Sequence, residues 1–171
     1  MSENIKPLVT VAVPAYNHEA WVEETILSIV NQTYGYENIQ LIVTDDCSTD
    51  RTPAILQKLA DKYNFELILN KQNMGICLTI NNMIKLTEGK YYIGIASDDI
   101  MFLDRIERQV EILTKNPEID ILAGRSIVID SEGKEIGSKY QSYDDSLTTY
   151  SFEDIFLDRK STRLNSSHGI I

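Results

Sequence analysis

The sequence predicts an α/β fold with a mainly parallel sheet, and three observations support this fold class. Short apolar runs rich in β-branched residues alternate along the chain with segments whose apolar residues recur at helical spacing. Such alternation requires right-handed crossovers between parallel strands. The length of 171 residues and the apolar share of 43% suit one compact domain with a real core.

Apolar patterns and the residues that typically start or stop helices and strands place the individual elements along the chain. The runs that predict strands are Leu8–Val13, which stops at Pro14, then Ile39–Val43, Phe65–Leu69 and Tyr91–Ala96. Helical spacing predicts helices over Glu19–Gln32, from Thr52 onward, after Gly75 and over Asp104–Thr114. Thr52 before Pro53 is typical of a helix start, and Gly89 is the expected stop of the third helix. Ile121–Ile129 and Glu135–Gly137 are expected to pair as a hairpin about 130–133.

Charge and cysteine content narrow the classes of function. The 26 acidic side chains outnumber 16 basic ones, and the net charge of −10 disfavours binding to nucleic acid or anionic membranes. An acidic protein can still bind a phosphate-bearing ligand through a divalent cation. Cys47 and Cys77 are too few for a disulfide framework. Because the sequence shows no secretory signal and no membrane-spanning run, the expected compartment is the cytoplasm.

Ligands of parallel α/β sheets bind at the carboxyl ends of the strands. Three polar segments follow predicted strands there: Pro14–Asn17, Asp45–Ser48 and Ser97–Asp99. The adjacent carboxylates of Asp98 and Asp99 repel each other, and a divalent cation would offset that repulsion. Mg²⁺ or Mn²⁺ prefers a few carboxylate oxygens together with substrate phosphates. The alternative is a solvated turn in which one aspartate caps the following helix.

Asp45 and Asp46 occupy the equivalent place on another strand, so both acidic pairs are expected at one rim of the sheet. One of these carboxylates could accept from the imide N–H of uracil or the exocyclic amine of another base, while the other caps the turn at Ser48–Asp50. Tyr16 either stacks on a base or fills space between strand and helix. In Asn73–Gly75 the glycine allows close approach to a ligand, although any strand-to-helix turn uses such residues.

Three further polar residues have open roles. His18 is interpreted as an exposed residue at a helix start rather than a base, and Asp50 as a turn or cap residue rather than a ligand. Arg105 either steadies the acidic loop, reaches a phosphate, or pairs within its own helix with Asp104 or Glu107.

Together these residues resemble the large family 2 of inverting glycosyltransferases with the GT-A fold. The motifs that match, in order and spacing, are Val11–Asn17, Ser28–Tyr34, Ile42–Asp50, Asn73–Gly75, Glu88–Tyr91, Ser97–Asp99 and Asp104–Val110. Each motif is weak alone, and the ordered set over residues 7–130 carries the resemblance. It implies a Rossmann-like three-layer α/β/α fold that transfers sugars from nucleotide-diphospho-sugars.

The resemblance also implies roles for individual residues. The residues expected to hold the nucleotide are Pro14, Ala15, Tyr16, Asp46, Asn73, Gly75 and Asp98. Asp99 is expected to bind the metal, Mn²⁺ or Mg²⁺. The implied chemistry is displacement at the anomeric carbon by an acceptor hydroxyl, with inversion, while nucleoside diphosphate leaves on the metal.

The sequence departs from the family pattern in several places. Ala96 stands where Asp is frequent, Cys47 where glycine is common and Leu103 where proline is common. The family's base, an Asp or Glu, is expected beyond the chain's native end, so no catalytic base is assigned. Residues 1–158 are interpreted as a glycosyltransferase domain truncated at its C-terminal side. Residues 159–171 are interpreted as a polar tail that is artefactual or disordered.

The leading hypothesis is a transferase that uses a nucleotide-sugar donor, in particular a UDP-sugar, in bacterial surface-polysaccharide synthesis. A glycan, a lipid-linked molecule or a protein is the expected acceptor, while a homodimer and attachment to the inner face of the membrane stay open. The alternative is a catalytically incomplete module that binds the donor without turnover. A receiver-like phospho-acceptor domain is disfavoured because no suitable lysine follows, and a dinucleotide-dependent oxidoreductase because the first strand lacks a glycine fingerprint.

Overall fold

The computed structural model describes residues 6–124 and 126–138. The chain divides into two compact units, of which the first runs to Leu122 and the second starts at Ala123. The tail expected at 159–171 lies outside the described residues, so it stays a prediction. Within the described part of the chain, no helix has the length and apolar character needed to cross a membrane.

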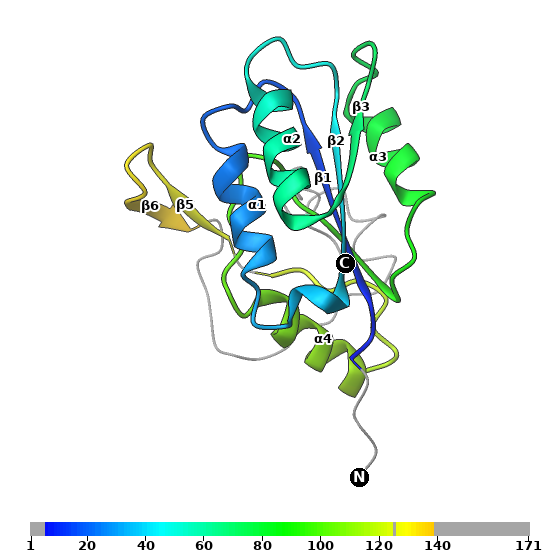
Figure 1. Cartoon of the computed structure of the whole chain (residues 1–171). Helices are drawn as coiled ribbons and strands as arrows, with labels where there is room; N and C mark the ends of the chain where they lie inside the picture. Colours follow the sequence, from blue (N-terminus) through cyan, green and yellow to red (C-terminus); the bar gives the residue numbers. More distant parts are fainter. Residues whose placement is uncertain (1–5, 125, 139–171) are drawn as a thin grey trace, which may run out of the picture. The chain divides into compact units, whose positions relative to one another are not determined.

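The first unit is built on a parallel four-stranded sheet in the order β3-β2-β1-β4 (Figure 1). Its strands are β1 (Val9–Ala15), β2 (Ile39–Asp45), β3 (Glu66–Leu69) and β4 (Tyr91–Gly94). β1 lies inside the sheet, where it pairs with β2 along its whole length and with β4 over Val9–Ala12. Because all four strands run in one direction, their carboxyl ends meet at a single rim. The predicted parallel sheet is confirmed.

β1 continues through Pro14, where the sequence predicted its end. The carbonyl of Ala12 accepts the amide of Ile95 at 3.1 Å, so the backbone hydrogen-bonding groups of Ala12 point toward β4. Residues two apart in a strand point their backbone groups to the same side, so the backbone nitrogen of Pro14 points toward β4 as well. Since β4 has already ended at Gly94, the N–H group that proline lacks is not needed for pairing.

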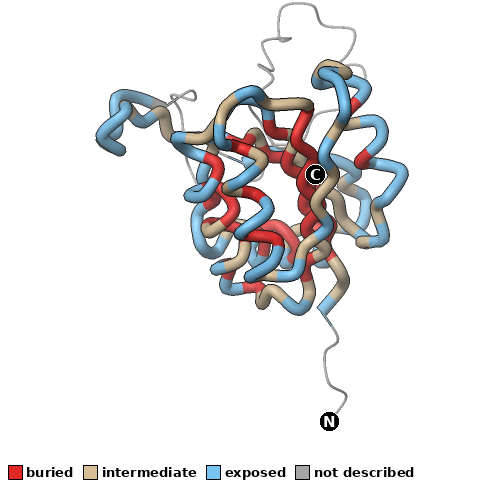
Figure 2. The backbone as a smooth tube through the Cα atoms, turned by 45° about the horizontal axis from the view of Figure 1, so that its top comes forward, coloured by how far each residue is buried: buried red, intermediate tan, exposed pale blue. Residues whose placement is uncertain are grey.

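Helices cover both faces of the sheet and complete three layers. They are α1 (Val22–Val30), α2 (Thr52–Tyr63), α3 (Ile76–Ile84) and α4 (Arg105–Lys115), and a short 3-10 helix, η1 (Tyr36–Asn38), precedes β2. The larger core joins one face of β1 to Ile26 of α1, Leu56 of α2 and Ile106 of α4. The smaller core joins the other face to Met83 of α3. Burial is concentrated in β1, in β2 and in the inward faces of the helices, as Figure 2 shows.

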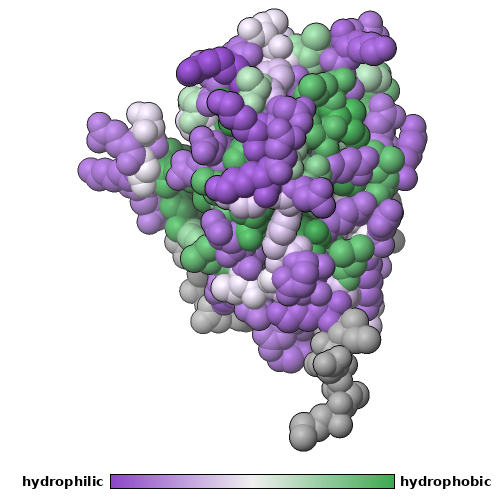
Figure 3. All heavy atoms as spheres, viewed as in Figure 1, coloured by the Kyte–Doolittle hydropathy of each residue, from purple (hydrophilic) through white to green (hydrophobic). Residues whose placement is uncertain are grey.

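The layer formed by α3 is thin. Its residues Ile76, Leu78 and Ile84 are about half exposed, and so is Leu69, the last residue of the preceding strand β3. In Figure 3, hydrophobic side chains lie over the β3 and α3 region within a mostly hydrophilic surface. This face is therefore less completely covered than the face that carries α1 and α2.

The third helix ends at Ile84, so the prediction that Gly89 stops it was wrong. Gly89 is instead needed for close packing at the entry to β4. A Cβ at this position would lie 2.5 Å from the backbone nitrogen of Thr10 and 2.9 Å from the carbonyl oxygen of Tyr91. The Gly89 amide also donates to Thr10 Oγ1 at 2.9 Å, which ties the entry of β4 to the start of β1.

The second unit contains the predicted hairpin. β5 (Ile127–Ile129) pairs antiparallel with β6 (Glu135–Ser138), and the amide of Gly133 donates to the carbonyl of Asp130 in the connecting turn at 3.0 Å. Gly133 has a φ of +79°, a conformation that favours glycine. The hairpin is confirmed, although its first strand begins at Ile127 rather than at Ile121.

The substitution Gly89→Ala should lower the free energy of unfolding by about 1–3 kcal/mol, because the new methyl group overlaps backbone atoms that cannot move independently. Gly94→Ala is the matched control, since its Cβ would meet nothing closer than the Tyr92 ring at 3.8 Å. The control should change stability by less than about 0.5 kcal/mol. Urea unfolding of both variants tests this, and equal losses would contradict the role assigned to Gly89.

Candidate functional site

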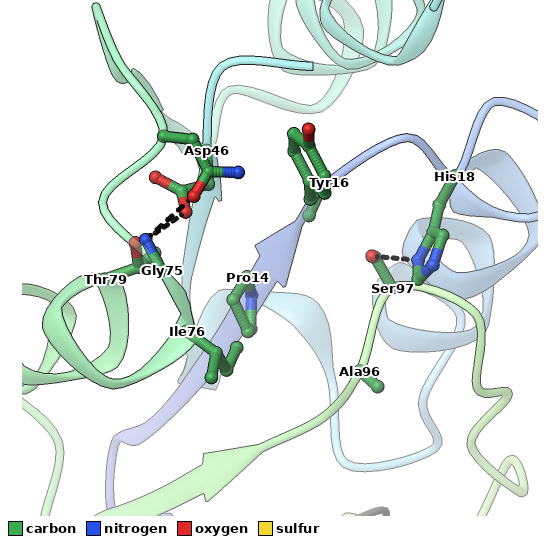
Figure 4. A pocket seen from close by; sticks show the side chains of 11 residues that line it. Pro14, Tyr16, His18, Asp46, Gly75, Ile76, Thr79, Ala96 and Ser97 are labelled. Carbon is green, nitrogen blue, oxygen red and sulfur yellow. Dashed lines mark hydrogen bonds between the residues drawn. The ribbon is translucent and has the colours of Figure 1, made fainter. Parts of the chain in front are cut away.

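A pocket of about 430 Å³ opens at the carboxyl rim of the sheet, beside the start of α3 (Figure 4). Its lining residues are Pro14, Ala15, Tyr16, His18, Asp46, Asn73, Gly75, Ile76, Thr79, Ala96 and Ser97. Every residue predicted to hold a nucleotide lines this pocket except Asp98. Asp98 directly follows Ser97, and Asp99 comes next, so the second acidic pair stands at the edge of the same pocket.

Asp46 is 4% exposed and holds the chain that leads into α3. Its Oδ1 accepts from Asn70 Nδ2 at 2.8 Å and from the Met74 amide at 2.9 Å, and its Oδ2 accepts from the Gly75 amide at 2.8 Å. Burial raises the pKa of this carboxyl, but the donors lower it further, so the pKa lies below its ordinary value. The buried Thr79 hydroxyl also helps to lower this pKa, although no hydrogen bond of standard geometry joins it to the carboxylate.

The hydrogen bonds to Asp46 limit what it can offer a ligand. A carboxylate has about four acceptor positions, and the protein uses two on Oδ1 and one on Oδ2. Hydrogen bonds of standard geometry thus leave one acceptor position on Oδ2. Asp46 is therefore a fixed, negatively charged acceptor for a single N–H or O–H group.

Asp45 has a different and structural role. It is 2% exposed, and its carboxylate accepts from the Ser48 amide at 2.9 Å and from the Ser48 hydroxyl at 2.5 Å. It caps the turn after β2, as predicted for one member of the pair. Cys47 stands inside this turn with a φ of +65°, the left-handed region where glycine carries no steric cost.

Side chains also fasten the turn after β1 to the turn after β2. Asn17 has a φ of +55°. Its backbone amide donates to Ser48 Oγ at 2.9 Å, and its side-chain Oδ1 accepts the backbone amide of Thr49 at 2.8 Å. Asp50 accepts the amide of Glu19 at 3.0 Å and that of Thr52 at the start of α2 at 2.9 Å. The prediction that Asp50 is a turn or cap residue is confirmed.

Two pocket residues close to β1, Tyr16 and His18, have surroundings that the sequence alone did not reveal. Tyr16 is 44% exposed and flanks the pocket, so it does not fill space between β1 and α1 (Figure 4). His18 does lie at a helix start, since its carbonyl accepts the amide of Val22 at 2.9 Å, but it is only partly exposed. Its Nδ1 lies 2.7 Å from Ser97 Oγ, and the residue lines the pocket. His18 Nδ1 also lies 4.0 Å from Asp98 Oδ1. The contact joins residues 79 positions apart, which local sequence patterns do not reveal.

Asp98 and Asp99 stand in more open surroundings than Asp45 and Asp46. The side chain of Asp98 is 47% exposed, and Asp99 is partly buried. Burial lowers the pKa of the Arg105 guanidinium, while the charge of Asp99 raises it. Arg105 therefore lies near Asp99, and its Nε donates to Gln109 Oε1 within α4 at 3.3 Å. Asp104, at the start of α4, instead pairs with Arg108 at 3.5 Å.

The described residues do not form a metal cage by themselves: among them no group of three or more His, Cys, Asp or Glu side chains is placed to hold an ion. Two adjacent carboxylates nevertheless fit Mg²⁺ or Mn²⁺, which commonly take one or two carboxylates plus phosphate and water oxygens. The remaining positions of a cation at Asp98 and Asp99 would be open to water and to the phosphate oxygens of a ligand.

Asp46→Asn should destabilise the protein by about 1–3 kcal/mol at pH 7, because the new amide group confronts backbone donors that need an acceptor. The folded-state pKa of Asp46 is lowered, so its stabilising effect is complete above the unfolded pKa of about 4 and is lost as pH falls through the folded value. The difference between variant and wild type should therefore shrink below about pH 4. Urea unfolding at several pH values measures this, with the exposed Asp61→Asn as control. A difference that stays constant down to pH 2 would refute the charged role of Asp46.

Comparison with known proteins adds to this geometry. The profile described as "Glycosyl transferase family 2" matches residues 10–170. An uncharacterized glycosyltransferase of Haemophilus influenzae is 39% identical over 141 residues, which are 81% of this chain and 43% of the relative. The minor teichoic acid biosynthesis protein GgaB of Bacillus subtilis is 37% identical over 67% of this chain and 13% of its own length. The chain thus spans less than half of these relatives.

Solved structures agree with the fold. The mannosyltransferase PcManGT of Pyrobaculum calidifontis, in complex with GDP-Man and Mn²⁺, has a TM-score of 0.65 at 24% identity, over 74% of this chain and 37% of that one. Residues 1–349 of S. aureus TarS, in complex with UDP-GlcNAc, give 0.62 at 27% identity, over 67% of this chain and 33% of that one. The GT-A fold expected from the sequence is confirmed. On its sequence and its fold, the chain belongs to glycosyl transferase family 2.

Proposed function

We propose that the pocket at the rim of the sheet is the donor site of a glycosyltransferase that uses a UDP-sugar. The observation that carries the proposal is the convergence of Tyr16, Asp46 and Ser97 on one pocket, with Asp98 and Asp99 directly after Ser97. A nucleoside diphosphate needs an aromatic face and a hydrogen-bond acceptor at its base end, and a cation-binding group at its diphosphate end. The S. aureus TarS structure, which binds UDP-GlcNAc, supports the donor class.

The base end of the pocket favours uracil. The exposed ring of Tyr16 offers a face for stacking, and Asp46 offers a single remaining acceptor position. Uracil presents one imide N–H, whereas guanine presents an imide N–H and an adjacent amino group. One free acceptor satisfies the uracil edge and leaves part of the guanine edge without a partner, which costs binding energy. UDP is accordingly the proposed nucleotide, with Pro14, Ala15, Asn73 and Gly75 shaping its site.

The phosphate end is assigned to the acidic turn. Asp98 is placed beside the ribose and diphosphate, and Asp99 is the proposed ligand of Mn²⁺ or Mg²⁺. When bound, the cation would neutralise charge on the diphosphate as it leaves the sugar. PcManGT, a structural neighbour with this fold, forms a complex with GDP-Man and Mn²⁺, which supports the proposal of a divalent metal here. Arg105 supplies positive charge next to Asp99 within the protein itself.

The whole reaction proposed is transfer of the sugar, with inversion, to an acceptor hydroxyl in the synthesis of a bacterial surface polysaccharide. The similarity to GgaB, a minor teichoic acid biosynthesis protein, supports this setting. The acceptor is proposed to be a glycan or a lipid-linked glycan on the cytoplasmic side. No described residue is assigned as the catalytic base.

Two substitutions separate the metal from the base. Asp99→Asn should reduce the Mn²⁺-dependent gain in UDP affinity at least about tenfold, and should leave metal-free affinity unchanged. Asp46→Ala should weaken UDP about tenfold with and without Mn²⁺, since it removes one charge-assisted hydrogen bond. Calorimetry measures both, and Asp104→Asn, an exposed carboxylate paired with Arg108, is the control. Unchanged Mn²⁺ dependence in Asp99→Asn would contradict the metal assignment.

Turnover is tested by the release of UDP from UDP-GlcNAc and related UDP-sugars. Binding with slow metal-dependent release, faster when a glycan acceptor is added, is the expected result. Binding with no release under any condition would show that this chain is a donor-binding module without turnover. A chain that binds no nucleotide would contradict the donor site altogether.

A further inference from the structure

A row of buried polar side chains on α1 and in the turn just after it contacts the segment that carries the second acidic pair. Thr25 and Ser28 of α1 and Gln32 after its end are 0%, 9% and 4% exposed. Their spacing of three and four residues places them on one side of the helix and of the turn that extends it. Buried polar groups cost free energy unless each has a hydrogen-bond partner, so their partners indicate why they are there.

The first partner lies immediately before the acidic pair. Thr25 Oγ1 donates to the carbonyl oxygen of Ser97 at 2.9 Å. The side chain of the same serine is 2.7 Å from His18 Nδ1, so Ser97 is held through its backbone and through its hydroxyl. The chain is thereby fixed at the residue that precedes Asp98.

The other partners lie just after the acidic pair. Ser28 Oγ accepts the amide of Met101 at 3.1 Å and donates to the carbonyl of Thr25 at 2.7 Å. Gln32 Nε2 donates to the carbonyl of Phe102 at 2.7 Å, and Gln32 Oε1 accepts the amide of Ile106 at 3.1 Å. Gln32 therefore holds both the end of the acidic loop and the first turn of α4.

We infer that Thr25, Ser28 and Gln32 are positioning residues that hold the turn of Asp98 and Asp99 in the geometry that takes up the cation. The inference rests on the proposed function of the rim. Only Asp98, Asp99 and Ile100 separate Ser97 from Met101, and both of these anchors are bonded to the same helix. A turn ordered in advance loses less conformational entropy when the cation and diphosphate bind.

The segment 28–34, which matches a motif of the family, has a role in the site by this arrangement although it does not line the pocket. Ser28 and Gln32 belong to this segment. Their side chains contact backbone atoms rather than side chains of the loop, so they restrain its position whatever residues it carries. A purely stabilising role would make the same bonds without any specific effect on the cation.

The two roles are separated by variants that remove one hydroxyl each with little change of volume. Thr25→Val and Ser28→Ala should each reduce the factor by which Mn²⁺ tightens UDP binding by about three- to tenfold, as expected for one lost hydrogen bond. Metal-free UDP affinity should stay within about twofold. Thr114→Val is the matched control, because the hydroxyl of Thr114 donates to Val110 within α4 at 2.7 Å. Thr25→Ser keeps the hydroxyl and should keep the wild-type Mn²⁺ factor.

Hydrogen exchange provides a readout that needs no ligand. Exchange at the amides of residues 99–101 should accelerate in Thr25→Val and Ser28→Ala, while the amides of β2 keep their protection. A wild-type chain whose UDP binding ignores Mn²⁺ would contradict the proposed function, and this inference with it. A wild type that responds to Mn²⁺ while both variants respond equally well would overturn this inference alone. Equal weakening with and without Mn²⁺ would also overturn it, because it would indicate general destabilisation.

Discussion

Parallel pairing of β1 with both β2 and β4 is the constraint on which the candidate site depends. β1 and β2 stay paired to Ala15 and Asp45, whereas β4 leaves the sheet after Gly94. The last residues of β1 therefore extend beyond their neighbour on one side. Pro14 is tolerated there because no strand remains for its missing amide to meet. The space beside this overhang, walled by Ala96 and Ser97 of the chain that leaves β4, is part of the pocket.

Hydrogen bonds, rather than apolar packing, shape the rim above this sheet. Two acidic pairs that look alike in sequence have been given different environments. The carboxylates of Asp45 and Asp46 are buried and take five donors from backbone and side-chain groups of the protein. Asp98 is instead half exposed, and Asp99 has the charge of Arg105 nearby. The first pair is thus suited to fix geometry and accept one donor, and the second to share a cation with a ligand.

The local patterns of the sequence predicted the four parallel strands, the four helices and most of the pocket residues that follow a strand end, because apolar periodicity and the strand-end rule are local or topological. The pocket contact of His18 was missed, and the role of Gly89 was wrong, for a common reason. Each depends on a contact with residues 79 positions away, His18 with Ser97 and Gly89 with Thr10. Of the buried polar residues Thr25, Ser28 and Gln32, the sequence showed only that the last two belong to a motif, since polar residues in and after an apolar helix do not reveal their partners.

The central claim is that one rim pocket binds a nucleoside diphosphate between two acidic turns. A crystal structure of the chain grown with UDP and Mn²⁺ tests it most directly. The account predicts the uracil ring against Tyr16, its imide N–H on Asp46 Oδ2, and the cation between Asp99 and the diphosphate. UDP bound away from the carboxyl rim, or Mn²⁺ held with no contact to Asp98 or Asp99, would contradict it.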